Sequence, residues 1–237
     1  MARDMTKGRI LPQMTAFAIP LILGNLFQIL YNATDSIIVG KFVGDDALAA
    51  VGTAGPIMNM AILFISGMCM GAGILMSTLY GAKDMKNLEK QISTTLIGGL
   101  VFSLLIAFLM IVFAVPILRL INSPEEIIGS AAIYLRVVFL GLIFTFVYNF
   151  LANTLRALGD SRTPLYFLVI SAFLNVAGDL LFVVTLKLGV MGSAVATVLS
   201  EALCCVCCGI YVKLKVPVLC LGKKWRVFER RVLWKTF

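Results

Sequence analysis

The sequence predicts an all-α, polytopic membrane protein built as a bundle of six transmembrane helices. Composition is the first reason: 60% of the 237 residues are apolar and only 14% are charged, whereas soluble domains carry about 25% charged residues. The second reason is the length of the apolar runs, because a helix needs roughly 20 apolar residues to cross a bilayer. The third is that charged segments such as "KFVGDD" and "GAKDMKNLEK" separate these runs.

Six spans follow from these boundaries. We expect them at about residues 14–39, 47–80, 92–115, 127–151, 164–186 and 189–212. The segment "NSPEE" before the fourth span predicts a helix start, with Ser123 as the cap and Pro124 at the first helical position. Pro164 suits the first turn of the fifth helix, where its missing N–H is not needed.

The distribution of Lys and Arg predicts the orientation in the membrane. Sixteen of the 20 lie at the termini or in even-numbered loops, whereas Lys41, Arg119 and Lys187 lie in the opposite loops. Because Lys and Arg gather on the cytoplasmic side, we expect both termini in the cytoplasm. An even number of spans requires the same arrangement. We therefore expect a multi-pass protein of the inner (cytoplasmic) cell membrane.

The chain divides into a transmembrane lobe, residues 1–212, and a basic tail, residues 213–237. The tail mixes Trp225, Phe228 and Trp234 with several Lys and Arg. This mixture predicts an amphipathic helix on the inner leaflet of the lipid bilayer, and a solvated linker is the alternative. The net charge of +8 lies in loops and tail, which is membrane-topology charge, so we expect no nucleic-acid partner.

Four ionisable side chains fall inside predicted spans, namely Asp35, Arg136, Asp179 and Glu201. A charge at the bilayer centre is costly, so each is a candidate for a functional site. The first and fifth helices both run outward, which places Asp35 and Asp179 at a comparable depth in the outer half.

Each of these two acids has an amide close by on the same helix. Asn32 precedes Asp35 by three residues and Asn175 precedes Asp179 by four, spacings that put the pairs on one helix face. Oxygen ligands of this kind suit a hard cation such as sodium. A carboxylate in a low-dielectric site also favours its protonated form, which suits a proton carrier. The residues leave proton and sodium open, and a purely structural bridge is the alternative.

The other two ionisable groups have two readings each. Arg136 either pairs with Asp35 or Asp179 or acts as a gate. Glu201, midway along the sixth helix, either faces a cavity or pairs with a small polar neighbour such as Ser200.

Polar stripes on the fourth and sixth helices are weaker signals. Asn149 and Asn153 are four residues apart, as are Ser193 and Thr197, and such stripes often serve interhelical hydrogen bonds. The sequence contains no histidine, no G-x-x-x-x-G-K-[ST] phosphate loop and no nucleophile beside a base. We therefore expect neither an enzyme nor a bound cofactor.

Four segments together resemble the amino-terminal half of the multidrug and toxic compound extrusion (MATE) transporters. They are "AIPLILGNLFQILYNATDSIIVGKFVG", "LRALGDSRTPLYF", "NVAGDLLFV" and "LGVMGSAVATVLSE". The resemblance implies an antiporter that exports cationic or amphipathic compounds such as drugs, driven by protons or sodium ions. It assigns the cation site to Asp35, Asn175 and Asp179, with Asn149 and Thr197 as contributors and Asn153 as a substitute.

The resemblance covers about residues 10–210, which is one of the two six-helix lobes of the family. The substrate path of the family lies between the lobes, so we expect a second lobe or a second copy of the chain as partner. Two alternatives stay open. One is a truncated half that inserts but transports nothing, and the other is a related lipid-linked sugar flippase.

Overall fold

The computed structural model describes residues 10–216, and helices account for nearly all of this range. The elements in chain order are α1 Ile10–Phe42, α2 Asp45–Gly81, α3 Met85–Leu120, α4 Glu125–Leu140, α5 Leu142–Ala157, α6 Arg162–Asp179, the π-helix η1 Leu180–Thr185 and α7 Gly189–Lys215. Within residues 10–216 there is no strand. The predicted basic tail begins inside α7, and from residue 217 on it lies outside the described range.

The predicted spans are confirmed in number and order. By length and composition, α1, α2, α3, α7 and the continuous segment formed by α6 and η1 can each cross a membrane. By the same criteria α4 and α5 together are long and apolar enough to form the sixth span, which is bent by 46° at its break. The fold is thus a helical membrane bundle, as the apolar runs predicted.

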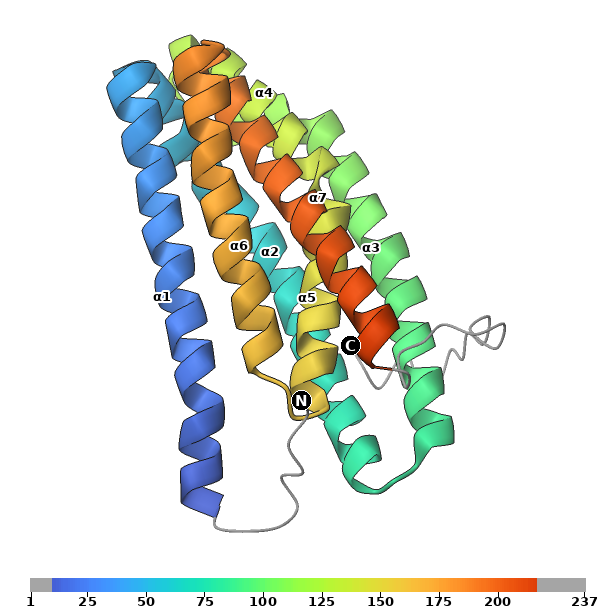
Figure 1. Cartoon of the computed structure of the whole chain (residues 1–237). Helices are drawn as coiled ribbons and strands as arrows, with labels where there is room; N and C mark the ends of the chain where they lie inside the picture. The colour runs from blue at the N-terminus through green and yellow to red at the C-terminus, as the bar shows by residue number, and fades with distance from the viewer. Residues whose placement is uncertain (1–9, 217–237) are drawn as a thin grey trace.

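The helices form one elongated bundle with α1 at its edge (Figure 1). α7 packs against α6, α4 and α5, and α2 packs against α3, α4 and α5. α1 lies mainly against α6, with fewer contacts to α2. The broken span α4–α5 therefore lies between α2 and α3 on one side and α7 on the other.

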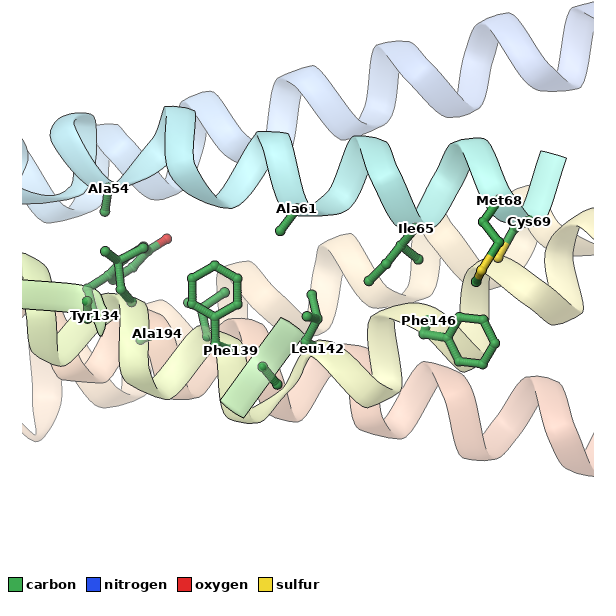
Figure 2. Packing of buried hydrophobic residues seen from close by; sticks show 14 of the residues in the cluster. Ala54, Ala61, Ile65, Met68, Cys69, Tyr134, Phe139, Leu142, Phe146 and Ala194 are labelled. Carbon is green, nitrogen blue, oxygen red and sulfur yellow. The ribbon is translucent and has the colours of Figure 1, made fainter. Parts of the chain in front are cut away.

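The core has small side chains on α2 opposite large ones on α4 and α5 (Figure 2). Ala54 and Ala61 are buried on α2, whereas Phe139 of α4 and Phe146 of α5 are among the largest fully buried side chains. Small residues let the helices approach closely, and the rings fill the space that remains. In a membrane, where lipid is as apolar as leucine, such packing contributes much of the association energy.

Many large apolar side chains lie on the outer surface of the bundle. Leu63, Phe108 and Phe173 are 72%, 65% and 70% exposed, values that would be a liability on a soluble monomer. Their places on α2, α3 and α6 fit helices whose outer faces contact lipid.

Local helix starts follow the sequence in one case and depart from it in another. Pro164 lies in the first turn of α6, as predicted. The prediction for Ser123 and Pro124 is wrong by one position, because Pro124 is the N-cap and α4 begins at Glu125. The Ser123 hydroxyl makes no hydrogen bond within the described part of the chain, so it does not cap the helix.

Candidate cation site

Asp35 reaches the interior from the C-terminal part of α1. Its side chain is 7% exposed and lies on the same buried side of the helix as Ile38 and Val39. The hydroxyls on either side of it turn back to the helix: Thr34 donates to the carbonyl of Leu30, and Ser36 to that of Asn32. The donor to Asp35 therefore comes from another helix.

That donor is Ser193 on α7, whose Oγ lies 2.6 Å from Asp35 Oδ1. Ser193 is fully buried. A short bond between a hydroxyl and a carboxylate is a strong, charge-assisted contact. It connects α1 to α7, a pair of helices that otherwise touch little.

Asn175 and Asp179 lie one turn apart on α6 and are 2% and 0% exposed. The amide nitrogen of Asn175 donates to Thr197 Oγ1 on α7 at 3.1 Å. Asp179 is the last residue of α6, and the π-helix η1 begins directly after it. Short π segments inside α-helices occur often at functional sites, because the wider turn changes the direction of the side chains next to it.

Three oxygens at this place have no donor in the described structure: Asn175 Oδ1 and both carboxylate oxygens of Asp179. Buried polar atoms are normally hydrogen bonded, so unsatisfied ones need an explanation. The carboxyl groups of Asp35 and Asp179 lie within electrostatic reach of each other. Two neighbouring carboxyl groups avoid mutual repulsion when one of them holds a proton.

The arrangement thus offers a buried pair of carboxyl groups with an amide oxygen beside it. It can share one proton between the acids, as other close carboxyl pairs do. It can equally present oxygen ligands to a small hard cation. The structure therefore brings Asp35, Asn175 and Asp179 together, with Thr197 holding the amide, at the common depth that the sequence indicated.

Glu201 lies lower on α7 and accepts a hydrogen bond from the Thr145 hydroxyl on α5. Glu201 thus pairs with a small polar residue, as one of its two predicted readings had it, but the partner is Thr145 and not Ser200, which donates to the backbone carbonyl of Thr197. Residues adjacent on a helix point about 100° apart, so they rarely meet.

Asn149 and Asn153 share a face of α5, as predicted, but their amide nitrogens turn to their own helix. Asn149 donates to the Thr145 carbonyl and Asn153 to the Asn149 carbonyl, both at 2.9 Å. Asn149 also accepts a longer bond of 3.4 Å from Ser66 on α2. Only the bond from Ser66 joins α5 to α2, and none of these contacts includes the carboxyl pair.

Two predicted residues lie outside the site. Arg136 is exposed and its Nε donates to the carbonyl of Ile111 on α3 at 3.4 Å, so the predicted pairing with Asp35 or Asp179 is wrong. The buried Tyr134 lies two positions earlier, which is about 200° around the helix. Asn32 is exposed on α1, so it does not accompany Asp35 into the bundle.

Two tyrosines near the carboxyl groups were missed. Tyr134 is 3% exposed and lies within electrostatic reach of Asp35, Asp179 and Glu201. Tyr31, one turn before Asp35 on α1, lies within reach of Asp35 and Glu201. The spacing of Tyr31 from Asp35 was a usable signal, whereas Tyr134 could be found only from the packing of α4.

A six-span helical bundle that buries a pair of carboxyl groups at the level of a π-helix belongs to the class of polytopic membrane transport proteins. The chain belongs to the MatE family, whose model matches residues 20–181.

Relatives of known name are multidrug proteins. The chain is 34% identical over 204 residues to the probable multidrug resistance protein YpnP of Bacillus subtilis (strain 168), covering 85% of this chain and 45% of that protein. It is 24% identical over 232 residues to the multidrug export protein MepA of Staphylococcus saprophyticus, covering 98% of this chain and 51% of that protein. The chain thus spans about half the length of the curated relatives it matches.

The fold is also that of solved family members. The structure matches the outward-facing conformation of a multidrug resistance MATE family transporter with a TM-score of 0.86 and 26% sequence identity. The match covers 94% of this chain and 50% of the other. Coverage of half of the other chain agrees with the expectation that this chain corresponds to one of the two lobes of the family.

Proposed function

We propose that this chain is one lobe of a secondary active antiporter, which exports cationic or amphipathic compounds such as drugs in exchange for protons or sodium ions. The observation that carries the proposal is the carboxyl pair of Asp35 and Asp179. These groups are buried in a membrane bundle, and Asp179 has no donor among the described residues. Such a pair is costly to keep unless a cation uses it.

The pair can couple two cations by competition for one negative charge. When a proton or sodium ion occupies the pair, a cationic substrate nearby loses its electrostatic partner. When the ion leaves, the charge returns and favours the organic cation. Because each ligand weakens the binding of the other by the same factor, alternating occupancy produces exchange. No covalent chemistry is required, which fits a carrier and not an enzyme.

The transport path requires a partner in this proposal. A second six-helix lobe, or a second copy of this chain, would supply the other wall of the substrate path in the inner cell membrane. The match to about half of each relative supports this requirement. In this proposal the transporter binds the coupling ion and the organic cation, and the lipid bilayer surrounds the lobe.

The test uses vesicles prepared from membranes of the host cell, so that the protein is present with any partner it assembles with. Ethidium serves as the organic cation. Asp35→Asn and Asp179→Asn each remove one ionisable oxygen while keeping the shape. We expect both to abolish ethidium efflux driven by a pH or sodium gradient. Asp46→Asn is the matched control, because Asp46 is exposed at the start of α2, and it should transport normally.

Retained efflux in either site variant would refute the proposal. A wild-type chain that inserts into the membrane but shows no gradient-driven efflux would favour the non-transporting half.

A further inference from the structure

Arg156 lies next to the last residue of α5, and its guanidinium has no acceptor within residues 10–216. The Nε atom is buried and makes no hydrogen bond there, while the side chain as a whole is half-buried. A guanidinium always carries its charge and has five N–H donors, and buried donors normally have a partner. An acceptor from outside the described part of the chain would therefore complete this site.

Asp160 is the acid nearest to Arg156 in the sequence, and its carboxylate is already occupied. Its Oδ1 accepts the backbone N–H groups of Arg162 and Thr163 at 3.2 and 3.1 Å, and its Oδ2 accepts the Thr163 hydroxyl at 2.7 Å. These bonds direct the carboxylate to the first turn of α6, where it satisfies free N–H groups. In the described range neither Arg156 nor Arg162 forms an ion pair.

The two arginines lie at the same end of the bundle. Only residues 158–161 separate α5 from α6, and this connection lies at the end where α1 begins (Figure 1). The Tyr148 hydroxyl of α5 donates to the Pro164 carbonyl at 3.0 Å, which fixes α5 against the first turn of α6. Arg156 is within electrostatic reach of the same tyrosine, so it lies on the side of α5 that faces the start of α6.

One exposed face of α6 continues from Arg162 as an aromatic and then apolar stripe. Its members are all exposed and follow one another at intervals of four, four and three residues: Arg162, Tyr166, Ile170 and Phe173. This spacing places them on one side of the helix. Tyrosine is enriched where membrane meets water, with apolar side chains deeper in the bilayer. The order along α6 thus matches a phospholipid, from its charged headgroup to its acyl chains.

We propose that Arg156 and Arg162 bind the phosphate of an anionic phospholipid, whose acyl chains lie along the stripe from Tyr166 to Phe173. A guanidinium pairs with phosphate through two parallel N–H bonds, and basic pockets between helices on the cytoplasmic side bind anionic headgroups. The distribution of Lys and Arg predicts that this end faces the cytoplasm. The apolar stripe favours a lipid over a carboxylate of a partner protein, because a carboxylate alone would not need it.

This lipid site is separate from the proposed antiport function. The carboxyl pair lies toward the other end of the helices, since Asp179 is the last residue of α6. Asp35→Asn and Asp179→Asn should therefore bind the lipid as the wild type does, whatever they do to transport.

The test measures how much a lipid raises the melting temperature of the protein, purified in detergent from host membranes with any partner it has. Phosphatidylglycerol is compared with phosphatidylcholine, whose headgroup has no net charge, and with inorganic phosphate. Each variant is its own reference, so a change in basal stability does not affect the comparison. We expect phosphatidylglycerol to bind the wild type more tightly than phosphatidylcholine does.

Arg156→Gln and Arg162→Gln should each weaken the apparent affinity for phosphatidylglycerol by about tenfold or more, as expected for one lost charge-assisted contact. Their response to phosphatidylcholine should not change. Arg156→Lys keeps the charge without the planar fork and should recover part of the affinity. Arg119→Gln is the matched control, because Arg119 is exposed at the other end of the bundle and already pairs with Glu125 at 3.3 Å.

Four outcomes overturn the lipid site. Equal stabilisation by the two lipids would show that the headgroup charge is not recognised, and wild-type affinity in Arg156→Gln and Arg162→Gln would show that these cations do not bind it. Stabilisation by inorganic phosphate equal to that by phosphatidylglycerol would make a soluble anion the ligand. If neither lipid binds and Arg156→Gln releases a co-purified protein, the guanidinium binds an acid of that protein and not a lipid.

Discussion

Replacing Gly99 by alanine tests whether α3 and α5 pack as closely as the structure indicates. Gly99 is buried near the middle of α3. A Cβ atom there would overlap the Phe146 ring atoms Cε2 and Cζ and would come within 2.8 Å of Met68 Cε. Phe146 is 0% exposed, so its ring has little room to move away. The Met68 methyl group is flexible and can shift more easily.

The expected free energy is the balance of two effects. Overpacking a well-filled core costs about 1–3 kcal/mol, and the fully buried ring places this site at the upper end. Alanine in place of glycine within a helix returns about 1 kcal/mol. The net loss is then about 2 kcal/mol, which for a protein of this size lowers the melting temperature by about 4–8 °C.

Thermal unfolding of the purified protein in detergent measures this shift. Gly67→Ala on α2 is the matched control, because an added Cβ there meets no atom within 4 Å. It should stabilise slightly through helix propensity alone, so the difference between the two variants isolates the overlap at about 3 kcal/mol. The double variant Gly99→Ala/Phe146→Leu should recover part of the loss, since the smaller side chain vacates the space.

A Gly99→Ala protein that melts at or above the temperature of Gly67→Ala would refute the close approach of α3 and α5. Equal melting temperatures for Gly99→Ala and the double variant would refute the role of the Phe146 ring.

Two further substitutions test contacts at the cation site and at the start of α6. Ser193→Ala removes the donor to Asp35. Loss of a hydrogen bond to a charged group costs about 1.5–3 kcal/mol, so ethidium efflux should fall by roughly tenfold or more. Ser193→Thr keeps the hydroxyl and should keep much of the efflux rate. Asp160→Ala removes the acceptor for the backbone N–H groups of Arg162 and Thr163 and for the Thr163 hydroxyl. It should lower the free energy of unfolding by about 1–2 kcal/mol in the same melting assay. An unchanged melting temperature would show that these contacts contribute nothing to stability.

Much of the fold could be predicted because the bilayer imposes a simple rule. Apolar length and charged boundaries place spans without any knowledge of packing, and all six were found in this way. The break inside the fourth span was missed, because it depends on a contact between helices. At Gly141 a side chain would overlap Val198 of α7, and a single sequence does not show which helix passes so close.

The sequence predicted how deep the residues of the candidate site lie along their helices, but not which way their side chains point. Charge in an apolar run marked Asp35 and Asp179, and counting residues along two helices of the same direction placed them at one level. Which side of each helix faces inward depends on packing. That is why Asn32 and Arg136, one turn or less from buried residues, point outward, and why Ser193 could not be identified as the donor to Asp35.

The hairpin of α2 and α3 is longer than any bilayer is thick. With 37 and 36 residues, the two helices extend about 55 and 54 Å, against about 30 Å of hydrocarbon. The polar residues where they meet, with Lys83 exposed in the turn, lie at one end of the bundle (Figure 1).

The joined end of this hairpin therefore stands in water whichever way the lobe is inserted. The Lys83 amine there can react with an amine-reactive label that does not cross the membrane. Because intact cells expose one side only, labelling at Lys83 reports the sidedness of the whole lobe from a single surface residue, independently of any transport measurement.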